Sequence, residues 1–120
     1  MQTDTRVAVD QTTNSAGGAV TVLRFAGDIS STSRDAVLGT YQGLAKDAHK
    51  RILLDFTKVD YLNSSGIALV IQLLLEAGRN EQRVQLFGLT PHFRKVFTMV
   101  GITKYTELFD DEGAAVASFD

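Results

Sequence analysis

Two neighbouring serines, Ser64 and Ser65, are the residues of this chain best placed to do chemistry. They follow an apolar run of strand length, residues 52–56, and come just before residues 67–77, an apolar run of helical length. Ser64 would therefore lie at a helix N-terminus, beside unpaired backbone N–H groups and about half a positive elementary charge. An anion, especially a phosphate carried on one of the serines, is electrostatically stabilised there.

Other chemistry for these serines finds little support. The nucleophile elbow of serine hydrolases needs Gly-x-Ser-x-Gly, and Leu62 stands where the first glycine would be. His49 and His92, the only histidines, are predicted on helices away from the serine loop and are interpreted as surface residues. Locally, capping of the helix alone also explains the serine pair.

Metal and cofactor sites are not indicated. There is no cysteine, which excludes disulfides, thiolate metal sites and thiol catalysis, and no phosphate-binding loop of the Gly-x-x-x-x-Gly-Lys-Ser/Thr type. The acidic residues 110–112 are interpreted as a solvated helix start. We therefore expect no cofactor.

Composition limits the remaining classes. The 120 residues are 44% hydrophobic and 22% charged, which predicts one globular domain over residues 1–120. A net charge of −2 gives no electrostatic basis for nucleic-acid binding. The longest apolar run, residues 67–75, contains Gln72 and is too short for membrane insertion. The N-terminus lacks the pattern of a secretory signal, so a cytoplasmic location is expected.

The pattern of elements predicts an α/β domain. Residues 6–11 and 19–25 read as a hairpin, and residues 52–56 and 83–87 as further strands. Helices are predicted from Ser33 to about Lys50, after Gly66, from Thr90-Pro91, and from about Asp111, with a short extended piece at 105–108. The first of these carries an apolar stripe of Val37, Tyr41, Leu44, Ala45 and Ala48. This alternation indicates a largely parallel sheet.

Hydroxyl-rich loops are predicted at the carboxyl ends of two strands, over residues 27–33 and 60–66. In the helix after Gly66, the predicted core stripe is Ile67, Val70, Ile71 and Leu74. Leu69 and Leu73 are expected on the opposite side, near Gln72 and Glu76, as exposed contacts for a partner. The alternative is that another helix covers both leucines.

Three segments together resemble the STAS domains, the anti-sigma factor antagonists. The first runs from Ile52-Leu53-Leu54-Asp55-Phe56 through Asn63-Ser64-Ser65-Gly66. The second is Phe25-Ala26-Gly27-Asp28-Ile29, and the third runs from Val96 through Gly101 to Ala115. The resemblance covers nearly the whole chain. It implies a four- to five-stranded mixed sheet with helices packed mainly on one face.

The resemblance also implies a function. The domain would be a non-catalytic switch, monomeric alone, whose unphosphorylated form binds an anti-sigma factor of the histidine-kinase-like ATPase fold and frees a sigma factor. That kinase would phosphorylate Ser64, and a PP2C-type phosphatase would reverse it. The surroundings of the phosphorylated serine would be Asn63, Ser65, Gly66, Asp28 and Ser30.

Two residues depart from the family pattern. The family aspartate before the phosphorylated serine is Asn63 here, and the aspartate of the upstream loop aligns with Ser30. Two alternative functions stay open: a STAS subunit of a transporter or stressosome-like complex, and a small nucleotide-binding protein that uses the strand-end loops.

Overall fold

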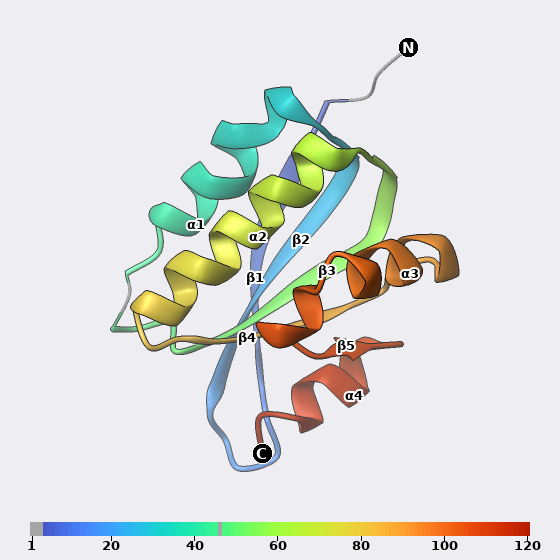
Figure 1. Ribbon diagram of the computed structural model, residues 1–120. Coiled ribbons are helices and arrows are strands. Elements are labelled where there is room, and N and C mark those ends of the chain that lie inside the picture. The colour runs from blue at the N-terminus through green and yellow to red at the C-terminus, as the bar shows by residue number, and fades with distance from the viewer. Residues whose placement is uncertain (1–3, 46) are drawn as a thin grey trace.

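A five-stranded mixed sheet organises the protein in a computed structural model that describes residues 4–45 and 47–120. The strands lie in the order β1 (Arg6–Thr13), β2 (Ala19–Ile29), β3 (Arg51–Leu62), β4 (Arg83–Phe87) and β5 (Leu108–Phe109). Only the β1–β2 pair is antiparallel within the described sheet, and the other pairs are parallel (Figure 1). The predicted hairpin and largely parallel sheet are confirmed.

Most helices cover one face of the sheet. They are the 3-10 turn η1 (Ser31–Ser33), the π-helical turn η2 (Asp35–Gly39), α1 (Thr40–Gln42), α2 (Ser64–Arg79), α3 (Pro91–Met99) and the 3-10 turn η3 (Ile102–Lys104). The main core lies beneath them, and α4 (Glu112–Ala117) packs on the opposite face over a smaller apolar cluster. Alternation along β2 supplies both cores, because Leu23 and Phe25 face the larger cluster whereas Val20 and Val22 face the smaller one. The predicted placement of helices mainly on one face is confirmed.

The first helical segment is shorter than predicted. It ends at Gln42 rather than near Lys50, and residue 46 lies outside the described residues. Val37 and Tyr41 of the predicted stripe are buried and Leu44 is half-buried, but Ala45 and Ala48 are exposed. Gly39 and Gly43 both weaken helix formation, and Gly43 forms the C-terminal cap.

Strands β2 and β3 are longer than predicted. Residues 27–29 belong to β2 rather than to a loop, and β3 continues to Leu62. Two register shifts accommodate the extension, one between Arg24 and Ala26 and one between Gly27 and Asp28. These irregularities interrupt the simple period of two that a strand shows in sequence.

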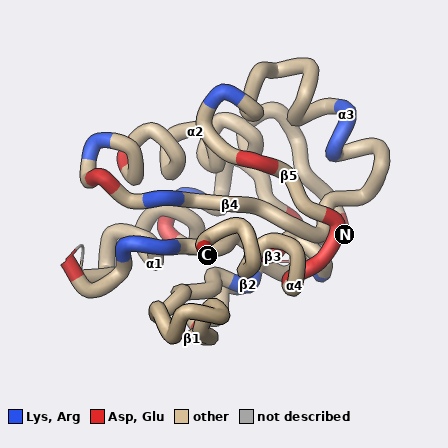
Figure 2. Tube along the Cα trace, turned by 90° about the horizontal axis from the view of Figure 1, so that it is seen from below, with Lys and Arg blue, Asp and Glu red and all other residues tan. Residues whose placement is uncertain are grey.

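Charged residues are interspersed along the trace, without a separate basic face (Figure 2). Arg24 forms ion pairs with three carboxylates, those of Asp10, Asp55 and Glu112, at 2.7–3.1 Å. Its hydrogen bond to Glu112 is the main cause that raises the pKa of Arg24.

Within residues 4–45 and 47–120, no helix has the length and apolar character needed to cross a bilayer.

Candidate phosphorylation site at the start of helix α2

Asn63 caps helix α2 and fixes the position of the two serines. Its side-chain oxygen accepts a hydrogen bond from the backbone N–H of Gly66 at 2.9 Å, and its carbonyl accepts from Ile67 at 2.9 Å. Ser64 is the first helical residue, so its hydroxyl lies beside the positive end of the helix dipole. An asparagine cap achieves this geometry without placing a carboxylate next to Ser64.

Gly66 lets the helix start lie directly against the end of β2. A Cβ atom on Gly66 would come within 2.2 Å of the Ile29 carbonyl oxygen. The same junction is tied by a hydrogen bond of 3.3 Å from the Asn63 N–H to that carbonyl. The end of β2 and the serine turn therefore meet at the carboxyl edge of the sheet, as the strand order predicts.

The serines differ in accessibility. Ser64 and Ser65 are exposed, and the described residues form no side-chain hydrogen bond with either hydroxyl. Ser30 is only 3% exposed, and its hydroxyl lies 3.2 Å from that of Thr32. A large enzyme can thus reach Ser64 or Ser65 but not Ser30.

Asp28 also lies at the carboxyl edge of the sheet, where its backbone is held by hydrogen bonds. Asp28 is half-buried, pairs with Tyr61 in the sheet, and accepts hydrogen bonds on its carbonyl oxygen from the Thr5 and Ser33 hydroxyls. The structure thus brings Asp28, Ser30 and the Asn63–Gly66 turn together.

The expectation that Leu69 and Leu73 are exposed is wrong. Leu69 is 7% exposed and Leu73 is fully buried, and both belong to the main core between the sheet and its covering helices. At about 100° per residue, Leu73 lies roughly 180° around the helix from Ser64, so it belongs to the face directed away from the serine. The turns η1 and η2 do pack against α2, and the burial of both leucines leaves neither as an exposed partner contact.

Gln72 and Glu76 line the same helix–helix contact. Gln72 accepts a hydrogen bond from Arg34 at 3.4 Å, and Glu76 accepts from the side-chain amide of Gln42 at 3.1 Å. Both residues are half-buried. Their polar groups therefore help to hold the first helical segment against α2.

A different ridge of α2 shares the surface with Ser64. Ala68 and Leu75 are exposed, Leu75 to 39%, and helical spacing places both on the Ser64 side. We call Ser64, Ala68 and Leu75 the switch ridge. Leu75 was not among the contacts expected from sequence, although its spacing of eleven residues from Ser64 corresponds to about 20° around a helix.

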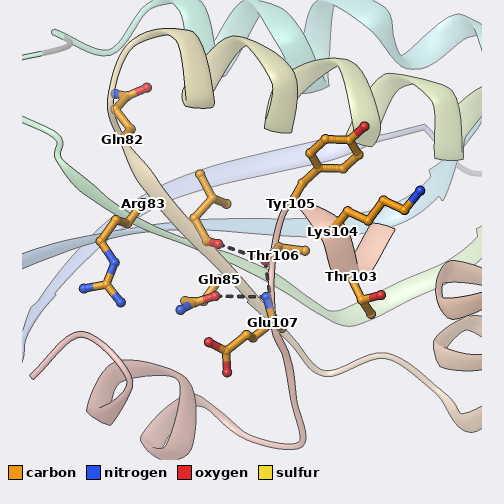
Figure 3. Close-up of a pocket in the computed structure, with 9 residues that line it drawn as sticks. Gln82, Arg83, Gln85, Thr103, Lys104, Tyr105, Thr106 and Glu107 are labelled. Atoms are coloured by element: carbon orange, nitrogen blue, oxygen red, sulfur yellow. Dashed lines mark hydrogen bonds between the residues drawn. The ribbon is translucent and has the colours of Figure 1, made fainter. Parts of the chain in front are cut away.

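The hollow shown in Figure 3 lies away from the serines. It has a volume of about 380 Å³ and lies between the first half of β4 and residues 103–107. Polar groups that line the hollow hold residues 106–107 against β4. The Thr106 hydroxyl donates to the Val84 carbonyl at 2.8 Å, and the Glu107 N–H donates to the Gln85 side chain at 3.0 Å. The labelled Arg83 and Lys104 side chains point away from one another. This hollow is at the amino end of β4, whereas Ser64 follows the carboxyl end of β3.

Comparison with known families identifies the domain. A family model described as "Mlab, STAS domain" matches residues 12–110. The chain belongs to the STAS domain family. The match includes both the end of β2 and the serine turn, so the site lies within the STAS domain.

Individual relatives are distant. A putative anti-sigma factor antagonist, BtrV of Bordetella bronchiseptica, is 24% identical over 78% of this chain and 80% of its own length. Among solved structures, an anti-sigma factor antagonist from Mycobacterium paratuberculosis has a TM-score of 0.79 at 16% identity, covering 96% of this chain and 93% of its own. The phosphorylated form of the Bacillus protein SpoIIAA has a TM-score of 0.64 at 20% identity, covering 95% and 99%. These similarities establish that this chain has the same fold as the two solved proteins.

Proposed function

We propose that this STAS domain is a cytoplasmic, non-catalytic anti-sigma factor antagonist. Its unphosphorylated form would bind an anti-sigma factor kinase of the histidine-kinase-like ATPase fold, and so release a sigma factor. Phosphorylation of Ser64 would abolish that binding, and a PP2C-type phosphatase would restore it. The observation that carries the proposal is the exposed Ser64 hydroxyl at the first position of α2.

The site favours a phosphate on Ser64. Phosphorylation adds about 1.5 to 2 negative charges, and a helix N-terminus stabilises nearby negative charge by about 0.3–2 kcal/mol. Asn63 keeps the cap neutral, so no carboxylate immediately precedes the new phosphate. We therefore expect the fold to survive phosphorylation almost unchanged.

The signal must then act on the partner surface. A thousandfold loss of affinity requires about 4 kcal/mol. Burying an unpaired dianion in a fitted interface supplies an energy of this size, because the phosphate loses its hydration without gaining partners. The switch ridge is the surface where such a phosphate would lie in the interface.

The switch ridge replaces the partner contacts expected from sequence. Ala68 and Leu75 present apolar atoms on the Ser64 side of α2, whereas Leu69 and Leu73 are buried in the core. Substitution of Leu75 by Lys should weaken partner binding without a large loss of stability. Met99, which is 75% exposed at the end of α3, is the matched control, because Met99→Lys changes an exposed apolar residue on another helix.

Reaction with the cognate kinase and ATP tests the proposal. Intact-mass analysis should show one added phosphate, and peptide mapping should place it on Ser64. The Ser64→Ala variant should remain unmodified, and Ser65→Ala should still accept phosphate. Phosphate found only on Ser65 would overturn the assignment of the site.

A further inference from the structure

A second candidate site lies on the sheet face opposite helix α2. There a hollow of about 290 Å³ spans β1, β2 and β3. Two rows of side chains form it: Arg6, Ala26 and Lys58 are neighbours in one row, and Ala8, Arg24 and Asp55 in the next. Phe25 and Val59, next in sequence to Ala26 and Lys58, point into the main core, so these rows face the other way.

The hollow arises from two local features. Ala8 and Ala26 put the smallest side chains of the region on neighbouring strands, which leaves space above the sheet. The register shift opposite Phe25 inserts one additional residue into β3, so that Asp55 and Lys58 share a face although three positions separate them. A regular strand would direct Lys58 into the core.

The charges around the hollow are divided unequally. Arg24 is saturated by Asp10, Asp55 and Glu112, and Asp55 also accepts hydrogen bonds from the Thr57 N–H and hydroxyl. Among the described residues, Asp55 is the only carboxylate that lines the hollow. Arg6 and Lys58 are exposed, and neither forms an ion pair with any residue in the described part of the chain.

We propose that this hollow binds a small organic anion whose apolar body lies over Ala8 and Ala26. Its anionic group would lie between the Arg6 guanidinium and the Lys58 ammonium, the two cations that flank Ala26. A volume of about 290 Å³ is near the lower limit for ligand pockets, which fits a ligand of one or two rings. The site is independent of Ser64 and of the proposed switch.

Three probes of one shape separate charge from apolar contact. They are 2-naphthoate, its neutral amide and 2-naphthylmethylammonium, titrated into the full chain and followed by amide chemical shifts. We expect 2-naphthoate to shift the Ala8, Ala26 and Lys58 amides in a saturable manner and to bind best of the three. Equal binding of all three probes, or shifts confined to other parts of the chain, would overturn the proposal.

Single variants locate the anionic group. Arg6→Gln and Lys58→Gln should each weaken 2-naphthoate binding by about two- to fivefold, the usual range for one exposed ion pair. Lys95→Gln removes an exposed cation from α3 and should leave the affinity unchanged. Ala26→Leu should fill the hollow and abolish binding, with circular dichroism as the check on folding. Retention of full affinity by both glutamine variants would show that these cations do not hold the ligand.

Discussion

The two ends of helix α2 are built in opposite ways. Beyond its C-terminal end, the Tyr41 hydroxyl donates to the Gln82 side chain and accepts from Asn80 at 3.0 Å. Gln82 also donates to the His49 carbonyl at 2.8 Å. At the N-terminal end, Ser64 and its neighbour Ser65 are exposed and contribute no side-chain hydrogen bond within the described residues. One end joins three segments of the chain, and the other leaves its hydroxyls accessible.

This difference separates stability from chemistry. Tyr41 is 3% exposed, and burial is the main cause that raises its pKa. A buried hydroxyl of this kind costs free energy when its partners are lost, whereas an exposed hydroxyl exchanges readily with water. We therefore expect the domain to tolerate a large charge at Ser64 while the opposite end of α2 maintains the fold.

Glycine-to-alanine changes at the two ends should have the largest and most divergent effects. Gly66→Ala should lower the free energy of unfolding by about 2–3 kcal/mol, because its Cβ would come within 2.2 Å of the Ile29 carbonyl oxygen. Gly78→Ala should raise it by up to about 1 kcal/mol, because a Cβ there meets nothing within 4 Å and alanine favours the helix. Urea unfolding measures the free energy of unfolding of both variants. Similar free energies for the two variants would contradict a tight junction at Gly66.

Removal of the Tyr41 hydroxyl should have the next largest effect. Tyr41→Phe leaves the buried Gln82 side chain without one partner, which should cost about 1–2 kcal/mol. Tyr61→Phe is the control, because Tyr61 is 51% exposed and should change stability by less than about 0.5 kcal/mol. Urea unfolding of the two variants is the measurement. Equal free energies of unfolding for the two variants would show that the hydrogen bonds of the Tyr41 hydroxyl contribute nothing measurable to stability.

The fold was largely predictable because its local signals agree. Thr90-Pro91 does begin α3, with Thr90 accepting from Phe93 at 3.2 Å, and Asp111 caps α4 by accepting from Ala114 at 2.8 Å. The position of Ser64 at the start of α2 followed from the same kind of reasoning. Capping residues and strand order act locally, so the sequence displays them directly.

Side-chain exposure on α2 was less predictable. Helix α2 is apolar around most of its circumference, and Leu69 and Leu73 are buried in the main core, where α2 contacts the sheet as well as η1 and η2. Sequence periodicity cannot say which of two apolar faces a second helix covers, since that depends on tertiary packing. The register shifts in β2 and β3 likewise depend on the partner strand.

Charge at Ser64 should act on binding far more than on stability. Ser64→Asp should change the free energy of unfolding by less than about 1 kcal/mol, since an acidic residue suits a helix N-terminus. It should weaken binding to the anti-sigma partner at least tenfold, which is about 1.4 kcal/mol, whereas Ser64→Ala should bind like the unmodified protein. Calorimetric titration measures affinity, with urea unfolding as control. Equal affinity of the two variants would mean that charge does not carry the signal.

Replacement of the cap should have the smallest effect on stability. Asn63→Asp preserves a side-chain oxygen that can accept from the Gly66 N–H, so the free energy of unfolding should change by less than about 1 kcal/mol. The phosphorylation rate should rise, because the family pattern places an aspartate before a serine that must be phosphorylated, and its carboxylate can orient the Ser64 hydroxyl. Repulsion between this carboxylate and the incoming phosphate opposes the gain in rate.

Single-turnover kinetics with the cognate kinase shows whether orientation of the hydroxyl or charge repulsion is larger, and Ser65→Ala controls for phosphate at the neighbouring serine. A slower reaction would show that repulsion dominates. A rate unchanged within about twofold would show that residue 63 acts only as a cap, since equal capping is what the two side chains share.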